Sequence, residues 1–252
     1  MEPVWYDYMY GLPTTLEFRG EAEAVLKTEA ARATRAGVPP VHAHLETGRP
    51  GWAAKREAER INSGLLVVGS RGLGAIGRFV TGSVSDELVQ HAPCPVLVCR
   101  GDRRSWPPTH IVVGDDLSDD SYSAALAAAR IAGALDLPVH LAHAIPPRYA
   151  SNGTAGSVRR RQDAERAATR AMQDRASRLE AEAGVKVVTE VVVGDPARAL
   201  LDHVSGGGKY GLITVGRRGR GMVKRTLLGS VSTKLIRAAR GPVLVVPPGV
   251  HQ

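Results

Sequence analysis

Short apolar runs alternate along the chain with longer segments in which apolar residues recur every three or four positions. In the C-terminal half, the short runs predict buried strands and the longer segments predict amphipathic helices. We expect strands at 111–114, 139–145, 185–193, 212–215 and 243–246, and helices at 121–134, 157–183, 196–204 and from 230 onward. Strands that alternate with helices in this way predict a doubly wound parallel sheet, an α/β fold.

The N-terminal half repeats this pattern incompletely. It predicts helices at 17–36, 50–61 and 86–91 and strands at 41–45, 65–68 and 96–99. The strand–helix pair at 111–134 has no counterpart in this half. The polar, proline-rich segment 101–109 between the halves is typical of a linker.

A glycine motif occurs twice, in register with its flanking strands. Gly69 and Gly216 each begin the spacing G-x2-G-x9-G-S, and the two copies lie 147 positions apart. The flanks keep this offset, so that Ala92 corresponds to Ala239. The repeat predicts a tandem duplication: a domain at 1–100 that lacks its N-terminal strand–helix unit, a linker at 101–109 and a complete domain at 110–252.

The second copy of the motif has the composition of an anion site. Its glycines follow the strand 212–215, and Gly229-Ser230 begins the next helix. Glycine lets backbone N–H groups approach a ligand closely, and a helix N-terminus favours negative charge. The loop holds no acid and carries the cations Arg217, Arg218, Arg220, Lys224 and Arg225. Phosphate is the expected anion.

The motif, the strand before it and the Pro-Val-Leu-Val strand after it resemble the universal stress protein family, in its ATP-binding branch. The resemblance covers nearly all of the chain, in two copies. It implies two tandem domains with an adenine nucleotide alpha hydrolase-like, Rossmann-like fold.

The resemblance also implies which residues bind the nucleotide. An aspartate after the first strand holds the adenosine end in the family; Asp116 is the better match here, and Asp115 remains an alternative. Leu117 stands where the family usually has glycine, and Ala144 would contact adenine through its backbone. The implied binding positions are Asp115, Asp116, Ala144, Gly216, Arg217, Gly219, Gly229, Ser230, Val231 and Ser232.

The first copy offers a weaker second site. It keeps the loop and helix-start positions Gly69, Gly72, Gly82, Ser83, Val84 and Ser85. It has no aspartate-bearing strand before them, and its loop holds fewer cations. We therefore expect the second copy to bind nucleotide and the first copy to bind weakly or not at all.

The resemblance implies an ATP-binding regulatory protein of the stress response, with ATP, with or without Mg, as its ligand and an unidentified protein as its partner. It also implies self-association through the last strands, 96–99 and 243–246, within one chain or between chains. The alternatives are a slow ATPase or autophosphorylating enzyme, and a sensor of AMP or a cyclic nucleotide. We expect no catalytic residue and at most weak hydrolysis, because no nucleophile elbow or general-base constellation is present.

Composition narrows the choice of partners. The net charge of +8 favours anionic ligands, but no basic helix with interleaved aromatics is present, so we rank a mononucleotide above nucleic acid. No apolar run reaches transmembrane length and the N-terminus lacks a signal-peptide pattern, so we expect a cytoplasmic protein that does not enter a membrane. His42 and His44 lack a third ligand nearby, and no metal site is expected.

Overall fold

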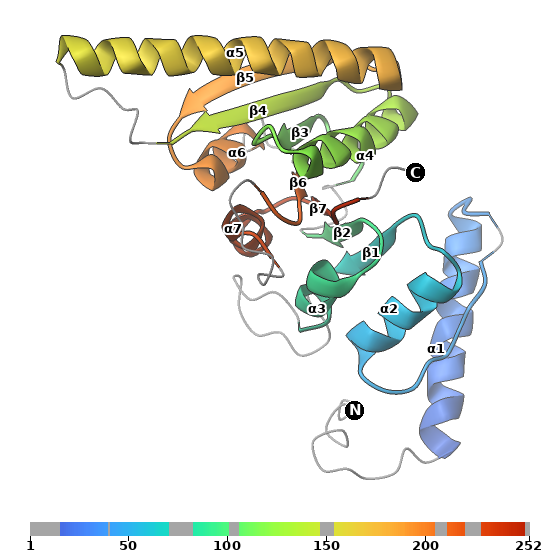
Figure 1. Ribbon diagram of the computed structural model, residues 1–252. Helices are drawn as coiled ribbons and strands as arrows, with labels where there is room; N and C mark the ends of the chain where they lie inside the picture. The colour runs from blue at the N-terminus through green and yellow to red at the C-terminus, as the bar shows by residue number, and fades with distance from the viewer. Residues whose placement is uncertain are drawn as a thin grey trace.

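A computed structural model of the chain describes residues 16–39, 41–70, 83–100, 106–146, 154–204, 211–219 and 228–249. Its strands are β1 (Leu66–Gly69), β2 (Val96–Cys99), β3 (Ile111–Gly114), β4 (Val139–Ile145), β5 (Val187–Val193), β6 (Leu212–Gly216) and β7 (Val243–Val246). Its helices are α1 (Leu16–Arg35), α2 (Pro50–Arg60), α3 (Ser83–His91), α4 (Asp119–Leu135), α5 (Ala155–Ala183), α6 (Pro196–Val204) and α7 (Ser230–Ala238). Figure 1 shows their arrangement.

The described strands form one seven-stranded sheet in the order β1-β2-β7-β6-β3-β4-β5. The five strands of the second copy, β3 to β7, are parallel wherever they pair with one another, as the alternation of strands and helices predicts. β6 lies inside the sheet and every residue in it is buried, which explains why its sequence is a continuous apolar run. The predicted doubly wound fold is confirmed.

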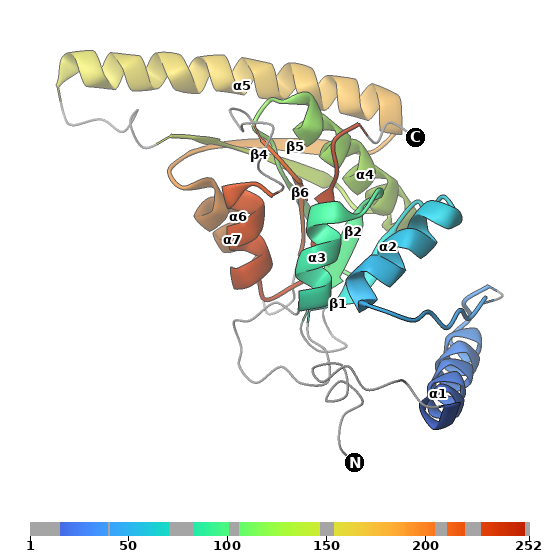
Figure 2. The same cartoon turned by 60° about the horizontal axis from the view of Figure 1, so that its bottom comes forward.

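Helices cover both faces of the sheet. One core cluster packs α4 and α5 against apolar residues of β3, β4, β6 and β7, and Figure 1 shows α5 lying along β4 and β5. A second cluster on the other face packs α3, α6 and α7 against the same sheet, and Figure 2 shows α6 beside α7. Within the described residues, no helix is long and apolar enough to cross a membrane.

The two copies meet at an antiparallel pair of strands. β2 runs antiparallel to β7, with Val96 opposite Val245 and Val98 opposite Val243. The last strands of the two copies thus associate within the chain, which was one of the two expected arrangements. Because β1 also pairs with β2 and β6 also pairs with β7, neither last strand has a free edge for a second chain. The expectation that they could also join two chains stays a prediction.

The strand expected at 41–45 is also wrong. These residues form no helix or strand, and Val41 and Leu45 are 40% and 38% exposed. At the offset of 147 they correspond to residues of β5, which pairs with β4. The described part of the first copy has no counterpart of β4, so an alternating segment there has no neighbour to accept its backbone hydrogen bonds.

Candidate functional site

A cavity of about 330 Å³ opens at the carboxyl ends of β3, β4 and β6. This is the edge at which open parallel α/β sheets bind ligands. The size falls at the lower end of the range of about 300–1,000 Å³ that small-molecule sites occupy. The cavity lies wholly within the second copy.

The cavity collects most of the residues that the sequence singles out. Those that line it are Asp115, Asp116, Ala144, Gly216, Gly219, Gly229, Ser230, Val231 and Ser232. Arg218 and His143 line it as well. Residues 220–227, with Arg220, Lys224 and Arg225, lie outside the described residues.

The amino end of α7 faces this cavity without a cap. Gly229 is its N-cap residue and supplies no side-chain hydrogen bond, and the first turn holds no acid. By contrast, Ser118 caps α4 and Thr154 caps α5 through their side chains. The first N–H groups of a helix have no partner within it. At α7 no described residue accepts from them, so they are suited to a ligand that accepts hydrogen bonds and carries negative charge.

Arg218 adds a cation to the same wall. Its Nε is buried and has no hydrogen-bond partner among the described residues. A buried donor without a partner costs free energy, and an acceptor placed in the cavity would remove that cost. A phosphate oxygen is such an acceptor, so the residues present fit a phosphate group.

Arg217 lies elsewhere, although the sequence groups it with the phosphate loop. It does not line the cavity: its side chain is buried and its Nη2 donates to the carbonyl of Ala92 in the first copy. Of the two loop cations in the described residues, Arg217 and Arg218, only Arg218 lines the cavity. Adjacent residues on a loop point in different directions, and glycine spacing does not encode which of the two points inward.

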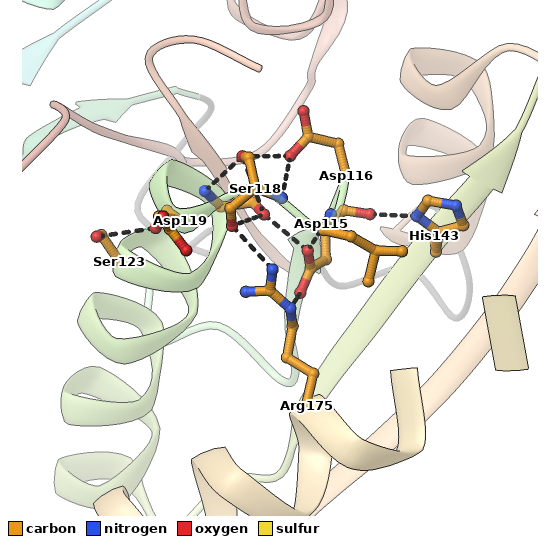
Figure 3. Close-up of polar contacts among 9 residues, drawn as sticks. Asp115, Asp116, Ser118, Asp119, Ser123, His143 and Arg175 are labelled. Carbon is orange, nitrogen blue, oxygen red and sulfur yellow. Dashed lines mark hydrogen bonds and ion pairs between the residues drawn. The ribbon is translucent and has the colours of Figure 1, made fainter. Parts of the chain in front are cut away.

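The structure gives Asp115 and Asp116 different surroundings (Figure 3). Asp115 is buried; its Oδ1 accepts from Leu117 N at 2.7 Å and Ser121 Oγ at 2.7 Å, and its Oδ2 lies 3.3 Å from Arg175 Nε. This carboxylate is held by the fold. Such a set of partners is typical of a structural anion, because buried charges are paired and hydrogen-bonded.

Asp116 is only partly buried and sits beside the phosphate loop. Its Oδ1 accepts from the backbone N of Ser118 at 3.1 Å and from the Ser118 hydroxyl. Its Oδ2 lies 2.5 Å from the point where a Cβ on Gly219 would be. Of the two carboxylates, Asp116 is therefore the one placed to reach a ligand.

Leu117 follows with a φ of +65°, in the left-handed region that favours glycine. This backbone shape explains why glycine suits the position in the family that the sequence resembles. The leucine side chain is partly buried against the core on the α4–α5 face. Its apolar contact offsets part of the conformational cost.

His143 presents an acceptor to the cavity. Its Nδ1 lies 2.7 Å from the carbonyl oxygen of Asp115. A carbonyl only accepts, so Nδ1 donates in this contact, and Nε2 is the ring nitrogen left to accept a hydrogen bond. The contact also fixes the ring near the carboxyl end of β4, where Figure 3 shows it beside Asp115.

Sequence reasoning missed the apolar wall of the cavity. Pro196, Ala199 and Leu200 of α6 line it, together with Val192 at the end of β5. The signal in the sequence is Asp195-Pro196, a helix start that follows the third strand of the second copy. An apolar wall opposite polar backbone groups suits a ligand with a flat, weakly polar ring at one end.

The corresponding positions of the first copy that the structure describes do not line this cavity. Gly69 ends β1, and Ser83, Val84 and Ser85 begin α3. Gly72 and Gly82 lie outside the described residues. β1 pairs with β2 along one edge, and the described part of the first copy has no strand to occupy the place that β3 takes beside β6.

Three histidines gather at the opposite, amino-terminal edge of the sheet. His110 and His140 lie with ring centroids 6.3 Å apart, and His203 lies 6.1 Å and 5.4 Å from them. Glu190 pairs with His203, with Oε2 2.8 Å from Nδ1. In the described part of the chain, no group of three or more His, Cys, Asp or Glu side chains has the geometry of a metal site.

Acidification is expected to destabilise the protein through this cluster. Burial lowers the pKa of His110 and His140, and the charge of His203 lowers both further. An unfolded chain has ordinary histidines of pKa about 6.5 and so binds more protons than the native one. The contribution of His110 and His140 to stability is therefore complete above about pH 6.5. It declines as the pH falls from there towards their lowered pKa values in the native state.

Urea unfolding at about pH 7.5, 6.5 and 5.5 measures this dependence of stability on pH, and the range lies above the ordinary carboxyl pKa values. The free energy of unfolding should fall with pH, and it should fall less in a variant carrying His110→Gln and His140→Gln. A wild-type stability that stays level or rises over this range would show that the prediction is wrong.

Comparison with known proteins gives a consistent family assignment. A model of the universal stress protein family matches residues 3–100 and 108–247. Universal stress protein relatives from Staphylococcus haemolyticus and Staphylococcus aureus are each 42% identical over 93 residues, or 36% of this chain and 56% of theirs. The chain thus spans about half the length of the curated relatives it matches. A universal stress protein structure from Archaeoglobus fulgidus is 25% identical, with a TM-score of 0.70, and covers 92% of this chain and 80% of that chain.

Proposed function

The chain belongs to the universal stress protein family, and on this premise we propose that it binds ATP in the cavity of the second copy and acts as a regulatory protein. In this proposal the nucleotide is a ligand rather than a substrate. Its binding orders the glycine loop and the start of α7, and a partner protein responds to that surface.

The observation that carries the proposal is the uncapped amino end of α7. It faces the cavity beside the buried, unpartnered Nε of Arg218, and Asp115, the buried acid of this region, is already paired with Arg175. The phosphate chain of ATP would accept from the first N–H groups of α7 and from Arg218. Mg²⁺, when present, would accompany the triphosphate.

The other end of the cavity suits adenosine. Asp116 offers a carboxylate, Ala144 offers its backbone and the α6 residues Ala199 and Leu200 form an apolar wall. We assign the adenine ring to this wall and the ribose or ring polar groups to Asp116. The site in the first copy lacks the elements that would supply these contacts, so we propose that nucleotide binds mainly in the second copy.

Calorimetric titration and native mass spectrometry test the proposal. We expect one ATP per chain, bound more tightly than AMP or cyclic AMP. We also expect an increase in the free energy of unfolding of about 2.7 kcal/mol at a hundredfold excess over Kd. Wild-type protein that binds no ATP, or that binds two ATP molecules equally tightly, would contradict the proposal.

The rate of phosphate release distinguishes the enzymatic alternative from the proposed regulatory role. A regulatory ligand is turned over slowly or not at all, whereas ordinary enzymes turn over at about 1 s⁻¹ or faster. Steady-state phosphate release at such a rate would replace the regulatory role with an ATPase. Preferential binding of AMP or cyclic AMP would instead indicate a monophosphate sensor.

A further inference from the structure

The two copies share one core across the β2–β7 pair. Leu88 of α3 and Leu235 of α7 belong to the same cluster, together with Val96 and Val245 from the paired strands. All four are at most 1% exposed. The first copy therefore shares one core with the helix whose amino end faces the cavity, and its residues in that core are fully buried.

Arg100, which follows β2 in the first copy, caps the other end of that helix. Its Nη1 donates to the carbonyls of Arg237 at 3.3 Å and Ala239 at 3.2 Å, and its Nη2 donates to the carbonyl of Ile236. The last carbonyls of a helix have no partner within it, and a cation there also interacts favourably with the negative end of the helix dipole. Arg100 thus fixes the carboxyl end of α7 to the first copy.

Arg217 makes a link in the opposite direction. Its side chain reaches from the glycine loop to the carbonyl of Ala92 in the first copy, while its own carbonyl accepts from Gly229 N at 2.9 Å. Burial, reinforced by the charge of Arg218, lowers its pKa to about 10, which still leaves it charged at neutral pH. One residue therefore joins the first copy to the start of α7.

The two acceptors correspond in the repeat. Ala92 and Ala239 are equivalent positions at the offset of 147, and each accepts from an arginine of the other copy. The link through Arg217 reaches the start of α7 and the link through Arg100 reaches its end. Packing alone does not require this, because neither arginine side chain belongs to the apolar core.

We propose that Arg100 and Arg217 are positioning residues for the phosphate end of the site. The first copy then serves as a rigid support for α7 and the glycine loop. The inference rests on the proposed function, because it concerns how the phosphate groups are held. Neither arginine needs to touch the nucleotide: each acts through the position of the α7 N–H groups.

Binding of ATP compared with adenosine tests the inference. In Arg100→Ala and Arg217→Ala, we expect the Kd for ATP to rise at least about tenfold. The Kd for adenosine should change by less than about threefold, because its end of the site lies on β3, β4 and α6. A purely structural loss would weaken both ligands alike. Arg100→Lys should recover part of the ATP affinity, since lysine keeps the charge but not the planar fork.

Arg32→Ala is the matched control. Arg32 is an exposed arginine of α1 in the first copy that pairs with Glu29 one turn away. The Arg32→Ala variant should bind ATP and adenosine with the same affinities as the wild type. Equal affinities for ATP in wild type, Arg100→Ala and Arg217→Ala would overturn the inference.

Hydrogen exchange without ligand separates this inference from the proposed function. In Arg100→Ala, the amides of Thr233 and Ala239, which bond to Gly229 and Leu235, should exchange at least about tenfold faster than in wild type. The amide of Gly184 at the end of α5 should not change. If wild type binds no ATP, the proposed function fails, and faster exchange confined to α7 still supports the role of Arg100 in holding that helix in position. Unchanged exchange in α7 would overturn it.

Discussion

Replacement of Gly219 by alanine is expected to weaken ATP binding at least about tenfold, a loss of about 1.4 kcal/mol in binding free energy. The new Cβ would lie 2.5 Å from Oδ2 of Asp116, a contact closer than carbon and oxygen allow. Asp116 is tied to Ser118 by two hydrogen bonds, so it does not swing away without cost. Either the loop moves back from the α7 N–H groups or the carboxylate leaves its position. Calorimetric titration with Mg-ATP measures the change.

Gly133→Ala is the matched control for this substitution. Gly133 lies within α4, away from the cavity, and an added Cβ would meet only Val185 Cγ1, at an ordinary contact distance of 3.6 Å. Alanine there should stabilise the protein by about 0.5–1 kcal/mol and leave ATP affinity unchanged. If Gly219→Ala bound ATP as tightly as Gly133→Ala, the loop would not hold the nucleotide.

Much of the arrangement of this cavity can be predicted from the repeat alone. The G-x2-G-x9-G-S spacing fixes the order strand, loop and helix, and parallel strands bring their carboxyl ends to one edge. Gly216, Gly229 and Ser232 therefore meet at the cavity as expected. Residues far apart in sequence came together because the topology, not local propensity, decides their proximity.

Side-chain direction could not be predicted in the same way. Arg217 and Arg218 are neighbours of the same type, yet one reaches the first copy and the other lines the cavity. The difference depends on the pairing of β2 with β7, which places Ala92 within reach of only one of them. Asp115 and Asp116 differ for a similar reason, since Arg175 approaches from α5 and meets only the buried carboxylate.

The segment 41–45 shows the limit of alternation as a signal. Its apolar and polar residues alternate as they do in a strand, but strand formation needs a neighbour, and none of the described strands lies beside it. The same reasoning explains the first copy as a whole. Its described residues hold no counterparts of β3 and β4, and of its two described strands β2 pairs with β7 and β1 pairs with β2. We therefore still expect the first copy to bind nucleotide weakly or not at all.

Removal of the Arg175 side chain is expected to cause the largest loss of stability. Arg175→Met leaves the Asp115 carboxylate, whose side chain is fully buried, without its cation. Removing one partner of a buried ion pair costs about 3–5 kcal/mol, because the remaining charge is uncompensated. Arg175 also donates to the Ser118 carbonyl at 2.9 Å and stacks over Tyr122, so we expect a loss of at least about 3 kcal/mol. Urea unfolding at neutral pH measures it.

Two further variants show whether the buried charge is the cause. Arg198→Met removes a pair to Asp202 in which both side chains are largely exposed, and it should change stability by no more than about 0.5 kcal/mol. Adding Asp115→Asn to Arg175→Met should restore part of the lost stability, because the amide keeps an oxygen for Leu117 N and Ser121 Oγ while removing the charge. If the double variant were less stable than Arg175→Met alone, the loss would come from packing around α5. The hydrogen bonds of the Asp115 carboxylate would then stabilise it in its buried position, and its ion pair with Arg175 would contribute little to stability.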